Sequence, residues 1–160
     1  MIESNVCLRK MRTEDIHLVE QWLNKDHIKK WFGDPQEWLE EINNFDGKYS
    51  WIVHYVVVYD EVPIGFCQYY DISRTGKGFA WDHEPIGTYG IDYLIGDERF
   101  LGKGFGSRII NKINEVVINN EGPVQLIADP IQENIASIRV LEKNGYIHDT
   151  ETGLYKLSIK

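Results

Sequence analysis

Apolar residues recur along the chain with two spacings, one typical of strands and one typical of helices. Strand-like apolar runs occupy residues 6–11, 50–59, 62–71, 89–95, 124–128, 146–147 and 154–159. Helical spacing covers residues 13–23, 107–118 and 133–143, and short helices with loops are expected between 24 and 46. This order predicts an α/β fold with a mixed, α+β-type central sheet and helices on its faces.

Turn and cap residues separate these elements. Asp60-Glu61 lies between two strand-like runs and predicts an antiparallel hairpin. Thr13 is expected to cap the first helix, and Gly145 lies where the last helix is expected to end. Residues 73–87 are expected to form a long polar loop. No repeat or low-complexity segment interrupts the chain, so we expect one domain over residues 1–160.

Composition and charge narrow the possible partners. The chain has 160 residues, of which 42% are hydrophobic, enough for one core and one active site. Its formal net charge of −8 argues against a nucleic acid, because phosphate binding needs a basic surface. Residues 1–98 carry 9 Lys and Arg against 18 Asp and Glu, whereas residues 99–160 carry 8 against 7. The first part would suit a cation and the second would tolerate an anion; a solvated acidic surface is the alternative.

Neither the cysteines nor the histidines have metal-binding spacing. Cys7 and Cys67 fall in apolar strand-like runs and are expected to be buried free thiols. The five histidines are scattered, so we predict no metal site. The chain opens without a basic and apolar leader, and the apolar run at 51–59 is too short to span a membrane. We therefore expect a cytoplasmic protein without a membrane partner.

A glycine-rich segment between a predicted strand and a predicted helix is the strongest chemical signal. It reads Arg99-Phe-Leu-Gly-Lys-Gly-Phe-Gly-Ser107. Glycines at alternate positions let backbone N–H groups turn toward one point, and the following helix adds the positive end of its dipole. A pyrophosphate could bind there, although the segment matches neither a Walker A loop nor a dinucleotide-binding GxGxxG. A turn without a ligand is the alternative.

Two motifs in this order resemble a known family. Arg99-x-x-Gly102-x-Gly104 resembles the acetyl-CoA pyrophosphate loop of the GNAT superfamily of N-acetyltransferases, and residues 134–146 resemble its later motif. Within that superfamily, residues 89–93 and Asp129-Pro130 are similar to the aminoglycoside 6′-N-acetyltransferases. This similarity covers residues 50–150, whereas the first 45 residues match only in general character. The resemblance implies a single GNAT-type domain and transfer of acetyl from acetyl-CoA to a primary amine.

The resemblance also implies which residues bind the coenzyme. Asn134 starts a helix that lies along the pantetheine arm in the family. Backbone N–H groups around Leu94 are the expected donors to the thioester carbonyl oxygen. The implied coenzyme-binding residues are Leu94, Ile95, Arg99, Gly102, Lys103, Gly104, Phe105, Gly106, Ser107, Asn134 and Ser137. Direct transfer within a ternary complex is the expected route, with acetyl-CoA as co-substrate.

Asp92 is the candidate catalytic residue. In the family, an Asp at its position contacts the acceptor amine. An alkyl ammonium cannot attack a thioester until it loses a proton, so a neighbouring carboxylate must hold the amine and accept or relay that proton. An ordinary carboxylate at a strand end is the alternative. The position of Asp92, before the glycine-rich segment, favours the catalytic interpretation.

Carboxylates and aromatic side chains are the candidates for acceptor binding. Carboxylates would pair with ammonium groups, and aromatic rings would stack on sugar faces or cations. The candidates are Trp31, Asp34, Tyr69, Trp81, Asp82, Glu84, Asp92 and Asp129. Solvated loop charges and core tryptophans are the alternative explanation. We expect a small cationic acceptor, and the sequence leaves monomer and homodimer equally open.

One residue departs from the family pattern. Many GNAT enzymes have a Tyr at the position of Leu141, where its hydroxyl protonates the departing CoA thiolate. Tyr93, Tyr146 and Tyr155 are possible replacements. The leading hypothesis is an aminoglycoside 6′-N-acetyltransferase. Two alternatives stay open, namely acylation of another small amine or a siderophore hydroxylamine, and a non-catalytic acyl-CoA-binding module.

Overall fold

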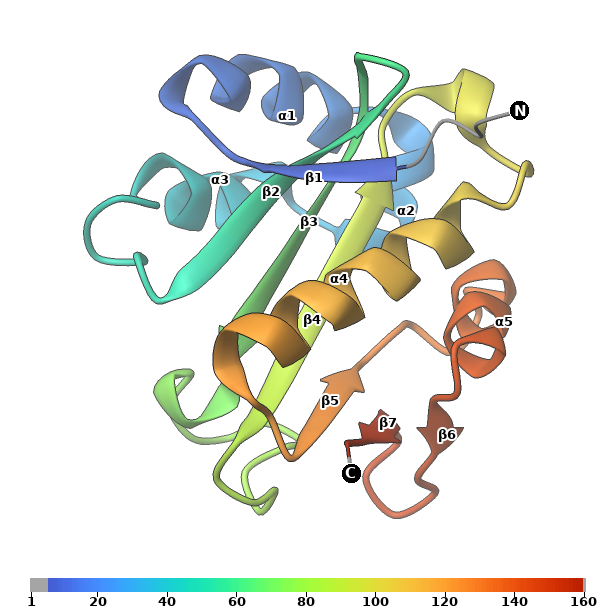
Figure 1. Ribbon diagram of the computed structural model, residues 1–160. Coiled ribbons are helices and arrows are strands. Elements are labelled where there is room, and N and C mark those ends of the chain that lie inside the picture. Colours follow the sequence, from blue (N-terminus) through green and yellow to red (C-terminus); the bar gives the residue numbers. More distant parts are fainter. Residues whose placement is uncertain (1–5, 160) are drawn as a thin grey trace.

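The computed structural model describes residues 6–159. The first residues, in which no leader was expected, lie outside this range. The described strands are β1 (Val6–Lys10), β2 (Ile52–Tyr59), β3 (Val62–Asp71), β4 (Thr88–Ile95), β5 (Gln125–Ala128), β6 (Ile147–His148) and β7 (Tyr155–Ser158). They form one sheet in the order β1-β2-β3-β4-β5-β7-β6 (Figure 1). All neighbours pair antiparallel except β4 and β5, which are parallel. The predicted α/β fold with a mixed sheet is confirmed.

Helices cover both faces of the sheet. The described helices are α1 (Ile16–Leu23), α2 (Asp26–Phe32), α3 (Pro35–Asn43), α4 (Phe105–Glu121) and α5 (Ile135–Lys143). α4 crosses one face, with α5 beside it, whereas α1, α2 and α3 lie on the other (Figure 1). Side chains alternate along β4 accordingly: Ile91 packs in the core under α4, and Leu94 packs in the core under α1–α3. Asp92 has the same parity as Leu94 and so belongs to the α1–α3 face.

The sheet splays open between β4 and β5. Their parallel pairing covers only Thr88–Gly90 of β4 and Gln125–Ile127 of β5. β4 continues to Ile95 while still paired with β3, whereas β5 ends at Ala128. The C-terminal half of β4 therefore has one edge without a strand partner among the described residues, and a pocket lies in this gap.

Two local predictions were wrong. Thr13 does not cap α1; it begins a short 3₁₀ turn, where the carboxylate of Asp15 accepts a hydrogen bond from the Arg12 N–H at 2.8 Å. Asp15 also pairs with Arg9 at 2.8 Å, so a carboxylate satisfies the turn instead of a hydroxyl. Cys7 is exposed because β1 is an edge strand, whereas Cys67 is buried as expected. None of the described helices is long and apolar enough to cross a membrane.

Candidate active site

A pocket of about 450 Å³ occupies the splay between β4 and β5. One wall is residues 91–95 of β4, and the opposite wall is residues 128–131, which follow β5. The start of α4 and the first two turns of α5 close one end, whereas α2 and α3 contribute aromatic side chains at the other. The pocket therefore joins a glycine-rich helix start to an acidic and aromatic region.

The glycine-rich segment forms a sharp entry into α4. Gly102 and Gly104 have φ angles of +70° and +82°, a region that favours glycine, and Gly104 directly precedes the helix. Both line the pocket, together with Phe105 and Gly106. The first N–H groups of a helix have no carbonyl partner within the helix, so this end can bind an anion. A methyl group on Gly106 would lie 3.4 Å from the Tyr93 hydroxyl, so the helix packs closely against β4.

The other predicted coenzyme residues are distributed differently. Asn134 and Ser137 line the pocket, and the Asn134 side chain caps α5 by accepting a hydrogen bond from the Ser137 N–H at 3.2 Å. Ser107 instead accepts a hydrogen bond at 3.1 Å from Asn144 of the α5 end, outside the pocket. Lys103 is exposed beside the loop. The coenzyme roles of these side chains stay predictions.

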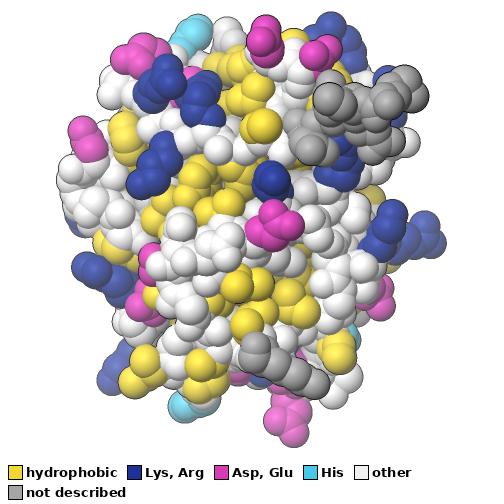
Figure 2. All heavy atoms as spheres, viewed as in Figure 1, with side chains coloured by type: hydrophobic (Ala, Val, Ile, Leu, Met, Phe, Trp, Pro, Cys, Tyr) yellow, Lys and Arg dark blue, Asp and Glu magenta, His cyan; other side chains and the backbone are white. Residues whose placement is uncertain are grey.

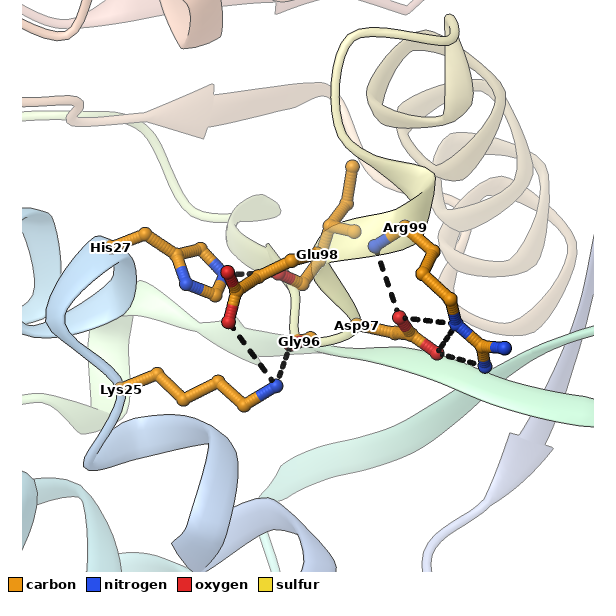
Figure 3. A network of polar contacts seen from close by, with 7 residues as sticks. Lys25, His27, Gly96, Asp97, Glu98 and Arg99 are labelled. Carbon is orange, nitrogen blue, oxygen red and sulfur yellow. Dashed lines mark hydrogen bonds and ion pairs between the residues drawn. The ribbon is translucent and has the colours of Figure 1, made fainter.

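Arg99 belongs to a polar network at the end of β4 (Figure 3). Its guanidinium pairs with Asp97 at 2.7 Å and is 76% exposed, so it points away from the pocket. On the other side of this turn, Lys25 donates a hydrogen bond to the Gly96 carbonyl at 3.0 Å. His27 donates its Nε2–H to the Ile95 carbonyl at 3.0 Å. These contacts hold the start of α2 against the strand end that leads into the glycine-rich segment.

β4 also presents backbone N–H groups to the pocket. Gly96 donates its N–H to the carbonyl of Ile64 in β3 at 2.8 Å. Because N–H groups alternate in direction along a strand, that of Leu94 also points toward β3, whereas those of Tyr93 and Ile95 point into the splay. The donors expected at Leu94 are therefore offered by the residues on either side of it.

Asp92 lies in the pocket wall under α1–α3. Its carboxylate accepts a hydrogen bond from Gln68 Nε2 of β3 at 3.0 Å. Burial raises the pKa of Asp92 to about 6; the Gln68 hydrogen bond acts against this shift, and the charge of Asp129 adds to it. A carboxyl group with a pKa near 6 is suited to accept a proton close to neutral pH.

Three further ionisable groups interact with the charge of Asp92, namely Glu41, Tyr70 and Asp129. Burial raises the pKa of Glu41, on α3, to about 7, and the charge of Asp92 contributes to this shift. Burial also raises the pKa of Asp129, which lines the pocket across from Asp92. The pKa of Tyr70 is raised well above its usual value by burial and by the three carboxylates. This concentration of negative charge would stabilise a bound cation.

The structure brings some of the predicted acceptor residues together and places others elsewhere. Trp31 and Asp129 line the pocket with Asp92. Asp34 is outside it and caps α3 by accepting a hydrogen bond from the Gln36 N–H at 2.9 Å. Tyr69 belongs to the core under α4, on the face of β3 opposite to Gln68. Only part of the predicted acceptor set therefore faces the splay.

The loop candidates have structural partners of their own. Trp81 stacks on Phe79 and packs against Tyr70. Asp82 accepts hydrogen bonds from two backbone N–H groups of its own turn, which lowers its pKa. Glu84 pairs with Lys156 of β7 at 2.8 Å. None of these three loop residues lines the pocket.

Sequence reasoning missed several residues at the site. His27 and Trp38 line the pocket, and the Trp38 ring lies 4.8 Å from that of Phe32, which belongs to the aromatic segment around Trp31 that was expected to bind the acceptor. The acidic and aromatic composition of residues 24–46 was the available signal, but it did not show which side chains face inward. Gln68 carried no signal, because a single Gln within a strand-like run is unremarkable.

The candidate acids for the thiolate are now distinguishable. Leu141 lines the pocket, so the departure from the family pattern lies at the site itself. Tyr93 also lines the pocket and its hydroxyl is 3.4 Å from Ser137 Oγ. Tyr146 donates a hydrogen bond to Asn114 at 2.6 Å in the core, and Tyr155 stacks on His148. Neither of the last two lines the pocket.

Comparison with known proteins agrees with this geometry. A family model described as an acetyltransferase (GNAT) domain matches residues 12–154. The chain belongs to this GNAT family. The aminoglycoside N(6′)-acetyltransferase type 1 of Klebsiella pneumoniae is 28% identical to this GNAT protein over 149 residues, 89% of this chain and 74% of that protein.

Solved structures give the same relationship. Aminoglycoside acetyltransferase AAC(6′)-Ib in complex with coenzyme A has a TM-score of 0.82 and 27% identity, covering 96% of this GNAT chain and 95% of that one. The complex of AAC(6′)-Ib with coenzyme A and kanamycin also has a TM-score of 0.82, with 25% identity and the same coverage. Among residues 6–159 of this GNAT protein, no group of three or more His, Cys, Asp or Glu side chains could hold a metal ion.

Proposed function

We propose that this GNAT protein transfers an acetyl group from acetyl-CoA to the 6′-amine of an aminoglycoside. One observation carries the proposal: the splay between β4 and β5 joins Asp92 to the glycine-capped start of α4 within a single pocket. The similarity to enzymes named as aminoglycoside N(6′)-acetyltransferases supports this choice of acceptor.

The coenzyme half of the pocket supplies N–H donors and no protein anion. The start of α4 offers backbone N–H groups and the positive end of the helix dipole to the pyrophosphate. The N–H groups of Tyr93 and Ile95 are available to the pantetheine arm and to the thioester carbonyl. A thioester oxygen that gains negative charge during attack is stabilised by such fixed donors.

The chemical step follows from the position of Asp92. The acceptor ammonium gives a proton to the ionised Asp92 carboxylate, and the free amine attacks the thioester carbon. A C–N bond forms and the C–S bond breaks, so CoA leaves as a thiolate. The thiolate takes a proton from Tyr93 or from water, because Leu141 has none to give, and the second proton released by the new amide nitrogen restores that donor.

The acceptor half of the pocket suits a molecule with several ammonium groups. Asp92, Asp129 and Glu41 are close enough that repulsion between carboxylates adds to the effect of burial on the pKa values of Asp92 and Glu41, and a bound ammonium would relieve this repulsion. Trp31 and Trp38 add aromatic faces for the apolar sides of sugar rings. A substrate bearing its own carboxylate, as expected for siderophore acylation, would be repelled by this cluster.

The direct test is CoA release from acetyl-CoA with a panel of kanamycin-type and gentamicin-type aminoglycosides. We expect saturable release, product acetylated at the 6′-amine by mass spectrometry and NMR, and loss of at least about 100-fold in kcat for Asp92→Asn. Asp46→Asn, which makes the same charge change on an exposed residue, is the matched control. Turnover of another amine with none of the aminoglycosides would refute the proposed acceptor, and tight acetyl-CoA binding without any turnover would favour a non-catalytic module.

The cellular setting belongs to the same proposal. We place the reaction in the cytoplasm, where acetyl-CoA is made and used. The oligomeric state, monomer or homodimer, stays a prediction that light scattering on the purified protein would decide.

A further inference from the structure

Three polar side chains form one row across the middle of the sheet. His54 of β2 lies opposite Gln68 of β3, and Gln68 lies opposite Asp92 of β4. Directly opposed residues on neighbouring strands have side chains on the same face, about 5 Å apart at Cβ. The whole row therefore lies under α1–α3, and Asp92 is its only member in the pocket wall.

The two inner members of the row are buried and incompletely hydrogen-bonded. His54 is 4% exposed and Gln68 is 2% exposed. Gln68 donates from Nε2 to Asp92 Oδ2 at 3.0 Å. Within the described part of the chain, neither Gln68 Oε1 nor either ring nitrogen of His54 has a hydrogen-bond partner. Buried polar atoms without partners destabilise a fold, so a polar side chain at such a position calls for a functional explanation.

The unpartnered atoms of His54 and Gln68 are complementary as hydrogen-bond donor and acceptor. Burial lowers the pKa of His54 to about 4, with the facing Gln68 amide acting in the opposite direction, so the ring is neutral at pH 7. A neutral imidazole carries one N–H donor, and Gln68 Oε1 is an acceptor without a donor. The two side chains face each other across the β2–β3 pairing, so a hydrogen bond from the ring to Oε1 would satisfy one atom of each. The Gln68 amide is then fixed with its oxygen toward β2 and its NH₂ group toward β4.

We propose that His54 is a positioning residue that orients the Gln68 amide, so that Gln68 donates to the Asp92 carboxylate and keeps it ionised for amine deprotonation. This inference rests on the proposed function, because it assumes that Asp92 accepts the proton. Without His54, the amide can turn over and present its oxygen to the carboxylate, which disfavours the ionised form.

The electrostatics around Asp92 define the expected signature. Three groups face this carboxylate: Glu41 from α3, Tyr70 from β3 and Asp129 after β5. None of these three groups is positively charged. The hydrogen bond from Gln68 is the contact that favours the ionised form of Asp92. Its loss therefore raises the pKa of Asp92 and moves the acid limb of the kcat/KM profile to higher pH.

The experiment compares two full-length variants. His54→Met is apolar and cannot donate, whereas His54→Gln carries an amide NH₂ that reaches the same oxygen. For His54→Met we expect an acid limb shifted up by about one pH unit and an activity at pH 5 reduced by roughly tenfold. Its melting temperature should stay close to that of wild type, because the loss of one buried hydrogen bond is offset by the removal of the other, unpartnered ring nitrogen. His54→Gln should recover most of the activity and the wild-type acid limb.

Three outcomes separate the possible failures. Equal pH profiles for wild type and His54→Met would overturn the inference. So would an activity loss that both variants share and that follows a lower melting temperature, since that indicates a packing role. Asp92→Asn is measured in parallel: if it retains full activity, the proposed role of Asp92 itself is wrong, whereas its loss beside an unaffected His54→Met refutes the role of His54 alone.

Discussion

Asp92, the residue that we propose accepts the amine proton, is unfavourable for folding when it is ionised. Its pKa rises from 3.8 to about 6 because the folded chain removes the carboxyl from water. A raised folded-state pKa means that the folded protein binds the proton more tightly than the unfolded chain. The stabilising contribution is therefore complete below pH 4 and is lost as the pH rises toward 6.

The first prediction follows from this sign. Asp92→Asn should be more stable than wild type by about 3 kcal/mol at pH 8, because it removes a buried charge, and equally stable near pH 3.5. Thermal or urea unfolding at the two pH values measures the difference. A variant that is less stable than wild type at pH 8 would show that the ionised carboxylate is not destabilising in the fold.

Tyr93 is the second residue whose role can be isolated. It lines the pocket near the start of α4, whereas Leu141 cannot protonate a thiolate. If its hydroxyl supplies that proton, Tyr93→Phe should lower kcat by about tenfold while the KM for acetyl-CoA changes little. Steady-state kinetics of CoA release measure both constants. Tyr155→Phe, a phenol outside the pocket, serves as the control, and an unchanged kcat for Tyr93→Phe would assign the proton to water.

At the scale of elements, α4 is flanked at both ends by a glycine with left-handed backbone angles. The two glycines allow the same substitution to be compared at the pocket end and at the far end of the helix. Gly104 precedes the helix with φ +82°, and Gly122 follows it with φ +57°. A Cβ at either position would meet no atom within 4 Å, so an alanine there brings backbone strain without a steric clash.

We predict that Gly104→Ala and Gly122→Ala each destabilise the fold by about 1 kcal/mol, measured by thermal unfolding. Only Gly104→Ala should also weaken acetyl-CoA binding, because Gly104 shapes the N–H groups at the pocket end of α4. Calorimetric titration with acetyl-CoA distinguishes the two. Equal coenzyme affinity for both variants would argue against an anion site at this helix start.

Helix α3 presents two neighbouring carboxylates with different surroundings. The charge of Asp92 helps to raise the pKa of Glu41, whereas the side chain of Glu40 is 63% exposed and lies 4.0 Å from Lys48. Trp38, one turn before Glu41, lines the pocket. Glu41 is therefore on the side of α3 that turns toward the site.

The corresponding prediction compares two identical changes. Glu41→Gln should raise the KM for the aminoglycoside by about fivefold, because an ammonium loses one carboxylate partner, with the KM for acetyl-CoA unchanged. Glu40→Gln should leave both constants near wild type. Kinetics with each substrate varied in turn provide the measurement, and similar effects of the two substitutions would mean that only the net charge of α3 matters.

At the scale of the whole molecule, charge separates into two regions in sequence but less visibly on the surface. Residues 1–98 hold most of the acidic excess. Figure 2 shows the face that carries α4 and α5, where basic and acidic side chains are interspersed around apolar patches. The negative charge that we propose attracts the acceptor is the cluster of Asp92, Asp129 and Glu41 in and beside the pocket.

This cluster predicts a salt dependence. The KM for a polycationic aminoglycoside should rise several-fold between 50 and 500 mM NaCl, because salt screens long-range attraction to the acidic region. An acceptor amine with a single charge should respond much less. Kinetics at both salt concentrations test this difference, and an insensitive KM would indicate that sugar stacking, rather than charge, provides the affinity.

Much of the fold followed from local pattern. Alternating apolar residues located every strand of the described sheet, and glycines with recognisable neighbours located the start of α4. These predictions succeeded because strand and helix periodicities, and the need for glycine at positive φ, are properties of a few adjacent residues.

The membership of the site was less predictable. Asp92, Trp31 and Asp129 line the pocket, whereas Asp34 serves as a helix cap and Glu84 is paired with a lysine about 70 residues away. A carboxylate has the same sequence signature whether it caps a helix, pairs with a lysine or faces a ligand. Only the packing of distant elements determines which of these partners is present.

The sequence by itself determined the order of elements, the glycine-shaped helix start and the carboxylate on the preceding strand, because each depends on short-range geometry. The tertiary structure decided the rest: where β4 and β5 separate, which N–H groups point into the gap, and which side chains meet there. The row from His54 to Asp92 is the clearest case, because strand register alone brings together residues 14 and 24 positions apart. The hairpin turn alone would not place His54 opposite Gln68, because the register of β2 and β3 shifts between Val57 and Val58.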